Sequence, residues 1–168
     1  GIVRELGDRQ GEASTLINLG VVAANQGKYA EAEAYYQQSL TIVRELGDRQ
    51  VESNALIALG IVATKQERYT EAEEYCQQSL AFFREIGDLS DEANALMVLG
   101  YITIEQERYA EAETYYQQSL AIVRELGDRQ SEATTLAGLG SIAHLQGQHA
   151  EAEPYYQQSL ALFRELGD

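Results

Sequence analysis

Basic residues are scarce in this chain. Lys and Arg number 12 against 27 Asp and Glu, which gives a formal net charge of −15 at pH 7, and no segment gathers the basic residues into a cluster. Binding to phosphates relies on basic side chains that release counterions. The charge balance therefore excludes nucleic acid and anionic membranes as partners, while the 45% of hydrophobic residues argues against a disordered chain.

Cysteine and proline occur once each. Because Cys76 is alone, no disulfide can form within the chain, and we expect a reducing compartment and a cytoplasmic location. Pro154 falls inside a stretch with a helical pattern, where its missing backbone N–H should kink the helix or delay its start. Long apolar runs are also missing: the longest stretch nearly free of charge, residues 93–104, is far too short to span a bilayer.

What the chain does contain is a repeat with a period of forty residues. The pair Leu-Gly recurs at 19–20, 59–60, 99–100 and 139–140, and Gln-Gln-Ser-Leu recurs at 37–40, 77–80, 117–120 and 157–160. A fixed period between 20 and 50 residues indicates a solenoid, in which each unit buries its apolar face against its neighbours. We therefore predict one continuous solenoid domain with repeat 1 at 9–48, repeat 2 at 49–88, repeat 3 at 89–128 and repeat 4 at 129–168, preceded by the remnant of an earlier unit's last helix at 1–8.

Each repeat has the pattern of two antiparallel helices. In repeat 1, small and apolar residues within 16–23, and again within 32–43, follow the i, i+3, i+4, i+7 spacing of one helical face. In repeat 2 the corresponding helices are expected at about 49–65 (helix A) and 70–86 (helix B). The predicted fold class is therefore all-α, with four antiparallel helix pairs.

Turn and crossing signals support this assignment. Gly27 lies between the two helices of repeat 1, where glycine can adopt positive φ, while Gly47 suits the position just past helix B and Asp48 suits the N-cap of the next helix. A glycine inside a helix costs about 1 kcal/mol against alanine, so its recurrence indicates a close helix crossing. The recurring glycines are Gly20, Gly60, Gly100 and Gly140, and small residues face them at Ala32, Ala72, Ala112 and Ala152.

The spacing Leu16-x2-Leu19-Gly20-x2-Ala23, followed by Ala32-x3-Tyr36, resembles the tetratricopeptide repeat. The resemblance covers all four repeats. Leu replaces the family's Trp, Ala or Thr replaces its first Tyr, and its Pro is replaced by Arg44 and the equivalent arginines, so helix B can continue to Leu46. This long form is similar to the repeats of kinesin light chains, Pins-type spindle-orientation adaptors and bacterial regulatory proteins. The resemblance implies a right-handed superhelix whose helix A faces line a concave groove that binds proteins.

The resemblance also implies which residues face that groove. They are Asn18, Val21, Asn54, Ile57, Ile61, Lys65, Asn94, Met97, Tyr101, Ile104, Ser141 and His144. These positions differ most among the copies, and several are apolar, so we expect a contiguous exposed strip of the kind that marks a partner site. The alternative is that the long helices tilt these residues into the core between repeats.

The expected partner is another protein. Some tetratricopeptide domains grip a terminal carboxylate with Lys, Arg and Asn, but only Asn18 and Lys65 are candidates here, so that clamp is absent. A peptide or an amphipathic helix with apolar anchors fits better, and the acidic balance favours basic flanks on it. The alternative is a structural or self-assembling array, excised or engineered, whose uncapped apolar ends meet head to tail without a dedicated ligand.

Enzymatic functions find no support in the sequence. Residues 138–143 match the dinucleotide pattern GxGxx(G/A), but they lie inside an expected helix with no strand before it. The recurring pair Glu31 and Glu33 points to different sides of a helix. His144 and His149 do not form a metal-ligand set with Cys76. We therefore predict no catalytic, cofactor-binding or metal-binding residues.

Overall fold

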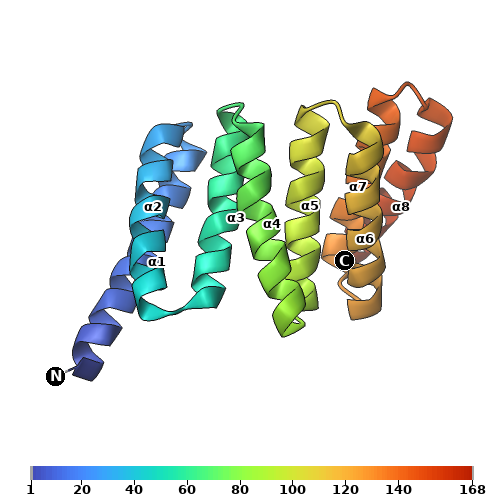
Figure 1. The fold of residues 1–168 in the computed structure, drawn as a ribbon. Coiled ribbons are helices and arrows are strands. Elements are labelled where there is room, and N and C mark those ends of the chain that lie inside the picture. Colours follow the sequence, from blue (N-terminus) through green and yellow to red (C-terminus); the bar gives the residue numbers. More distant parts are fainter. Residues whose placement is uncertain (1, 168) are drawn as a thin grey trace. The chain divides into compact units, whose positions relative to one another are not determined.

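The computed structural model describes the backbone of residues 2–167 and the side chains of residues 7–167. All regular structure in this part of the chain is helical (Figure 1). The helices are α1 (Ile2–Asn25), α2 (Tyr29–Leu46), α3 (Arg49–Lys65), α4 (Tyr69–Ile86), α5 (Leu89–Glu105), α6 (Tyr109–Leu126), α7 (Arg129–Leu145) and α8 (His149–Gly167). Odd-numbered helices are the A helices of the four repeats and even-numbered ones are the B helices, as the sequence predicts.

The chain divides into two compact units, with the boundary between Phe82 and Phe83 in α4. Unit 1 contains repeat 1 and repeat 2 as far as Phe82, and unit 2 contains the end of repeat 2 with repeats 3 and 4. In unit 1, α2 packs against both α1 and α3, and in unit 2 the helices α5 to α8 pack each against the next. Within each unit, one helix pair therefore stacks directly on the other. That all four repeats form one continuous domain remains a prediction.

Residues in the left-handed region end the helices where the sequence predicts. Gly27 follows α1 with φ of 73°, and Gly47 follows α2 with φ of 69°. Past Gly47, the amide of Asp48 donates back to the carbonyl of Val43 at 3.0 Å. The Asp48 carboxylate then accepts from the amide of Val51 at 3.1 Å and caps α3. One glycine and one aspartate thus finish one repeat and begin the next.

Two expectations about the helices differ from the structure. α1 runs through Gly7 and Asp8 without a break, so residues 2–8 continue the first helix and do not form a separate one. α8 begins at His149, at the place equivalent to the start of α6, so Pro154 does not delay it. The buried side chains of Ala152 and Leu162, one on either side of the proline, hold α8 against α7.

Close contacts explain the glycines at the helix crossings. An added Cβ would lie 2.4 Å from the ring of Tyr36 at Gly20, and 2.4 Å from the sulfur of Cys76 at Gly60. No carbon atom fits at such distances in a closely packed interior. The close approach predicted for these positions is confirmed.

A buried hydrogen bond recurs in every repeat. A serine hydroxyl in helix B donates to a main-chain carbonyl of helix A, and each of these serines is buried. The pairs are Ser39 to Ala13 at 3.0 Å, Ser79 to Ser53 at 2.8 Å, Ser119 to Ala93 at 3.0 Å and Ser159 to Ala133 at 2.8 Å. This bond satisfies the hydroxyl in the core and sets how far along each other the two helices lie.

Candidate partner-binding surfaces

The predicted groove residues of unit 1 differ in exposure. Asn18, Asn54 and Lys65 are exposed, and so are the apolar side chains of Val21 and Ile61, at 44% and 39%. Val21 and Ile61 hold equivalent positions in α1 and α3. Exposed β-branched side chains at matching places on two A helices form an apolar element of the kind that partners bind.

Ile57 does not belong to this exposed surface. Its side chain is buried, with 6% exposed, so the expectation of an exposed strip that includes Ile57 is wrong for this residue. Its side chain is part of the protein interior, which agrees with the alternative interpretation of its position.

In unit 2, the predicted groove residues are either exposed or half-buried. Asn94 and His144 are exposed, while Tyr101 and Ser141 are half-buried. The remaining two, Met97 and Ile104, are half-buried and pack against the hydrophobic core of the unit.

A contact between neighbouring A helices explains the partial burial of Met97. The Thr135 hydroxyl of α7 lies 3.2 Å from the Met97 sulfur of α5. The two A helices of unit 2 are therefore adjacent where Met97 and Thr135 lie. This part of the predicted groove surface is packed between the helices.

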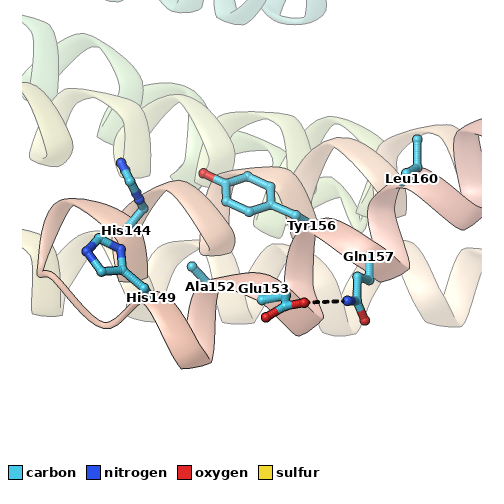
Figure 2. A pocket seen from close by; sticks show the side chains of 7 residues that line it. All are labelled: His144, His149, Ala152, Glu153, Tyr156, Gln157 and Leu160. Atoms are coloured by element: carbon cyan, nitrogen blue, oxygen red, sulfur yellow. Dashed lines mark hydrogen bonds between the residues drawn. The ribbon is translucent and has the colours of Figure 1, made fainter.

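The region around His144 contains a surface hollow (Figure 2). Its volume is about 350 Å³, and its lining residues are His144, His149, Ala152, Glu153, Tyr156, Gln157 and Leu160. The imidazole rings of His144 and His149 lie 5.0 Å apart at 50° to each other. The lining is mostly apolar along α8, because Ala152, Tyr156 and Leu160 follow at intervals of four residues.

His144 is a predicted groove residue, but the sequence does not predict the α8 side of the hollow as a surface, because Tyr156 and Leu160 hold core positions in the other repeats. Tyr36 and Leu40, at the same positions in repeat 1, are each only 3% exposed. The sequence predicts apolar ends in general terms, but it does not distinguish a core position in the last repeat from one in the middle.

Gly138, part of the dinucleotide-like pattern, has a packing role. An added Cβ at Gly138 would lie 2.2 Å from the ring of Tyr116 in the preceding repeat, and one at Gly100 would lie 2.6 Å from the same ring. The ring is thus enclosed between α5 and α7. Burial of the phenol raises the pKa of Tyr116 above its ordinary value.

Polar contacts also join the two repeats of each unit. In unit 1, Arg44 pairs with Glu52 and Glu33 pairs with Arg68 across the two repeats, each at 2.7 Å, while Arg68 also pairs with Glu71 of its own repeat at 2.7 Å. The hydrogen bond from Arg68 to the Glu33 carboxylate stabilises the guanidinium and raises the pKa of Arg68. Arg44 holds the place of the proline in the resembled family, so the arginine replaces a helix breaker by a bridge to the next repeat.

Reactive groups in the described part of the chain are few. Cys76 is fully buried against Gly60, and burial raises the pKa of its thiol to about 12. Within residues 7–167, whose side chains the structure describes, no group of three or more His, Cys, Asp or Glu side chains is placed to hold a metal ion. Over the same residues, no helix is long and apolar enough to cross a membrane.

Comparison with known proteins identifies a family and a fold. A family model described as the tetratricopeptide repeat matches residues 11–88 and 91–165. No protein of curated function matches the chain in sequence.

Several solved structures share the fold. BtubC (BKLC) from P. vanneervenii is 18% identical, with a TM-score of 0.81 over 92% of this chain and 64% of its own. Aspartyl phosphate phosphatase F from Bacillus subtilis is 16% identical, with a TM-score of 0.87 over 95% of this chain and 42% of its own. A Rap protein complexed with competence and sporulation factor is 16% identical, with a TM-score of 0.83 over 94% and 44%. These likenesses confirm the all-α helical-repeat fold class, and the chain spans less than two thirds of each of the three proteins.

Proposed function

Because the chain belongs to the tetratricopeptide repeat family, we propose that it is a scaffold that binds a peptide or an amphipathic helix of another protein on its helix A faces. The observation that carries this proposal is the exposure of Val21 and Ile61, two apolar side chains that the core does not use. Asn18, Asn54 and Lys65 are exposed on the same two helices and supply polar groups. Apolar anchors with a few polar contacts are what peptide-binding grooves offer.

A similar structure, the net charge and one aromatic side chain also support a binding role. A Rap protein of similar fold is complexed with competence and sporulation factor, which supports a ligand-binding role for this chain. The net charge of −15 favours a partner with basic flanks. In unit 2, the half-buried Tyr101 on α5 is the equivalent of Ile61 and supplies an aromatic anchor.

The proposal predicts which substitutions weaken binding. Peptides are first selected from a random library against the wild-type chain, and their affinities are then measured by fluorescence anisotropy. Ile61→Glu and Tyr101→Ala should each weaken binding by roughly tenfold or more, with unchanged helicity by circular dichroism. Leu126→Glu is the matched control, because Leu126 is 45% exposed near the end of helix B in α6. Unchanged affinity in both groove variants, or equal loss in the control, would refute the groove assignment.

A structural array is the second candidate function. It is favoured by the large apolar side chains exposed on α1 and α8, among them Val22 at 53% and Leu160 at 49%. In such an array, copies of the chain stack end to end and need no further ligand.

A further inference from the structure

The two histidines of the chain lie next to each other at the turn between α7 and α8. His144 belongs to the last turn of α7, and His149 is the first residue of α8. Both side chains are exposed, and their ring centroids are 5.0 Å apart. Figure 2 shows the two rings together at one end of the hollow. A sequence with two histidines thus brings both imidazoles to one place.

The backbone of the turn determines this proximity. Gly147 adopts a φ of 75°, and its amide donates to the carbonyl of His144 at 2.9 Å. The next amide, of Gln148, donates to the carbonyl of Ala143 at 2.8 Å. Such bonds close a helix at a left-handed residue and reverse the chain. Position 149 therefore returns to the side of position 144.

The turn itself repeats, but the histidines do not. In repeat 1, Gly27 has a φ of 73°, and the amides of Gly27 and Lys28 donate back to α1 in the same way. The side chains at the two places are Ala24 and Tyr29 in repeat 1, Thr64 and Tyr69 in repeat 2, and Ile104 and Tyr109 in repeat 3. The histidine pair is therefore specific to repeat 4 and is not required by the fold of the repeat.

The pair is internal to repeat 4, because the bonds that place both histidines lie within their own turn. In repeat 3, on which repeat 4 packs through α6 and α7, the equivalent residues Ile104 and Tyr109 are still partly exposed. An adjacent repeat thus leaves these two positions accessible to small ions.

The spacing of the two rings fits the coordination of one metal ion. A bond from a metal to an imidazole nitrogen is about 2.0–2.1 Å long, so the ring centroid lies about 3.2 Å from the ion. Two rings bound at the tetrahedral angle then have centroids about 5.2 Å apart, and two bound at a right angle have centroids about 4.5 Å apart. The distance of 5.0 Å between the rings of His144 and His149 lies between these values.

The surroundings of the pair also suit a cation. The side chains that line the hollow include no Lys or Arg, and they include the carboxylate of Glu153, one helical turn after His149. This carboxylate accepts a hydrogen bond from the amide of Gln157 at 2.8 Å. It contributes negative charge near the rings, but among the described side chains it is not placed as a third ligand.

From this geometry we infer that His144 and His149 form a two-ligand site for a divalent transition-metal ion that prefers nitrogen donors, such as Zn²⁺, Ni²⁺ or Cu²⁺. Neutral imidazole suits all three ions. Water completes the coordination, so the site is open, unlike a closed structural site with four protein ligands. Cys76 is buried in another repeat and takes no part. The inference goes beyond the proposed binding function, because it requires neither a peptide nor an array.

Copper(II) alone is the probe that tests this site, because it binds imidazole most tightly of the three ions. Calorimetry should show one ion bound per wild-type chain, and pulsed electron paramagnetic resonance should show coupling to two imidazoles. His144→Ala and His149→Ala should each weaken the affinity by at least about tenfold and leave one coupled imidazole. Both side chains are exposed, so both variants should keep the wild-type helicity in circular dichroism.

The matched control is Glu153→Gln, which removes the nearby charge and should retain coupling to two imidazoles. The inference is overturned if copper on the wild-type chain couples to one imidazole or to none, or if either histidine variant binds copper as tightly as the wild type. It is also overturned if sedimentation velocity shows one ion joining two chains. These measurements contain no peptide, so a failure of the peptide selections would leave them unaffected.

Discussion

Single buried side chains fix how the two helices of a repeat lie against each other. The hydroxyl of Ser79 is buried and donates to the carbonyl of Ser53, and the three equivalent serines repeat this bond. A shift of one residue along either helix would remove this bond between the helices and leave the Ser79 hydroxyl only the carbonyl of Tyr75 in its own helix, at 3.3 Å. The glycines at the crossings act with the serines, because Gly60 admits the sulfur of Cys76 only at one level.

This role predicts the effect of removing one hydroxyl. Ser79→Ala should lower the free energy of unfolding by about 1 kcal/mol, because a buried hydrogen bond between helices is lost. The matched control is Thr41→Ala, since the Thr41 hydroxyl bonds to the carbonyl of Gln37 within one exposed helix turn. Urea unfolding followed by circular dichroism measures both. Equal losses in the two variants would show that the serine does not hold the helices in register.

At the scale of single helices, capping residues determine where each helix begins and ends. Three repeats begin with an aspartate cap, and the cap of α7 has an additional donor: both the hydroxyl and the amide of Ser131 bond to the Asp128 carboxylate. These bonds favour the ionised carboxylate and lower the pKa of Asp128 below its ordinary value of 3.8.

At the ends of α3 and α5, Glu67 and Glu107 adopt positive φ of 61° and 60° where the first repeat has glycine. Each costs about 1 kcal/mol against glycine, so the turn is imposed by packing.

The lowered pKa of Asp128 makes the cap sensitive to pH. The folded state binds the proton of Asp128 more weakly than the unfolded chain does. The stabilisation by the ionised cap is therefore complete above the ordinary pKa of the carboxyl group, and it is lost as the pH falls through the lowered pKa of the folded state. Asp128→Ala should therefore lower the free energy of unfolding by about 1 kcal/mol at pH 7, and by progressively less below about pH 4. Urea unfolding of both proteins across this range measures the difference. A constant difference between pH 7 and the acid limb would contradict the cap mechanism.

On the scale of the whole molecule, repetition separates the residues that build the fold from those available for recognition. Many apolar positions shared by the copies, such as Leu59 and Leu99, are buried in the core. Positions that vary include Val21 and Ile61, which are exposed on the A helices.

Local chemistry made much of this fold predictable. Helix A of repeat 2 was expected at 49–65 and occurs as α3 (Arg49–Lys65), because an aspartate cap and a glycine stop act within a few residues of the helix end. Period and spacing likewise sufficed for the helix pairs and for the close crossings at the glycines.

Burial across repeats was harder to predict. Ile57 is buried and Met97 is half-buried, because helix packing, and not the pattern within one helix, decides which side faces solvent. In the sequence, Gly138 matches part of a dinucleotide-binding pattern. Only the structure shows that this glycine leaves room for the ring of Tyr116 in the preceding repeat. The groove itself remains a prediction for the residues other than Ile57.

The most direct test of the central claim, that the helix A faces bind a partner, is site-specific photo-crosslinking. A photoreactive phenylalanine derivative is placed at Ile61 or, as the control, at Leu126, and each protein is irradiated with a peptide selected against the wild-type chain. We expect a covalent peptide adduct at position 61 and none at position 126, detected by mass spectrometry. An adduct at 126 with none at 61 would show that the partner binds the B helices and would contradict the proposed function.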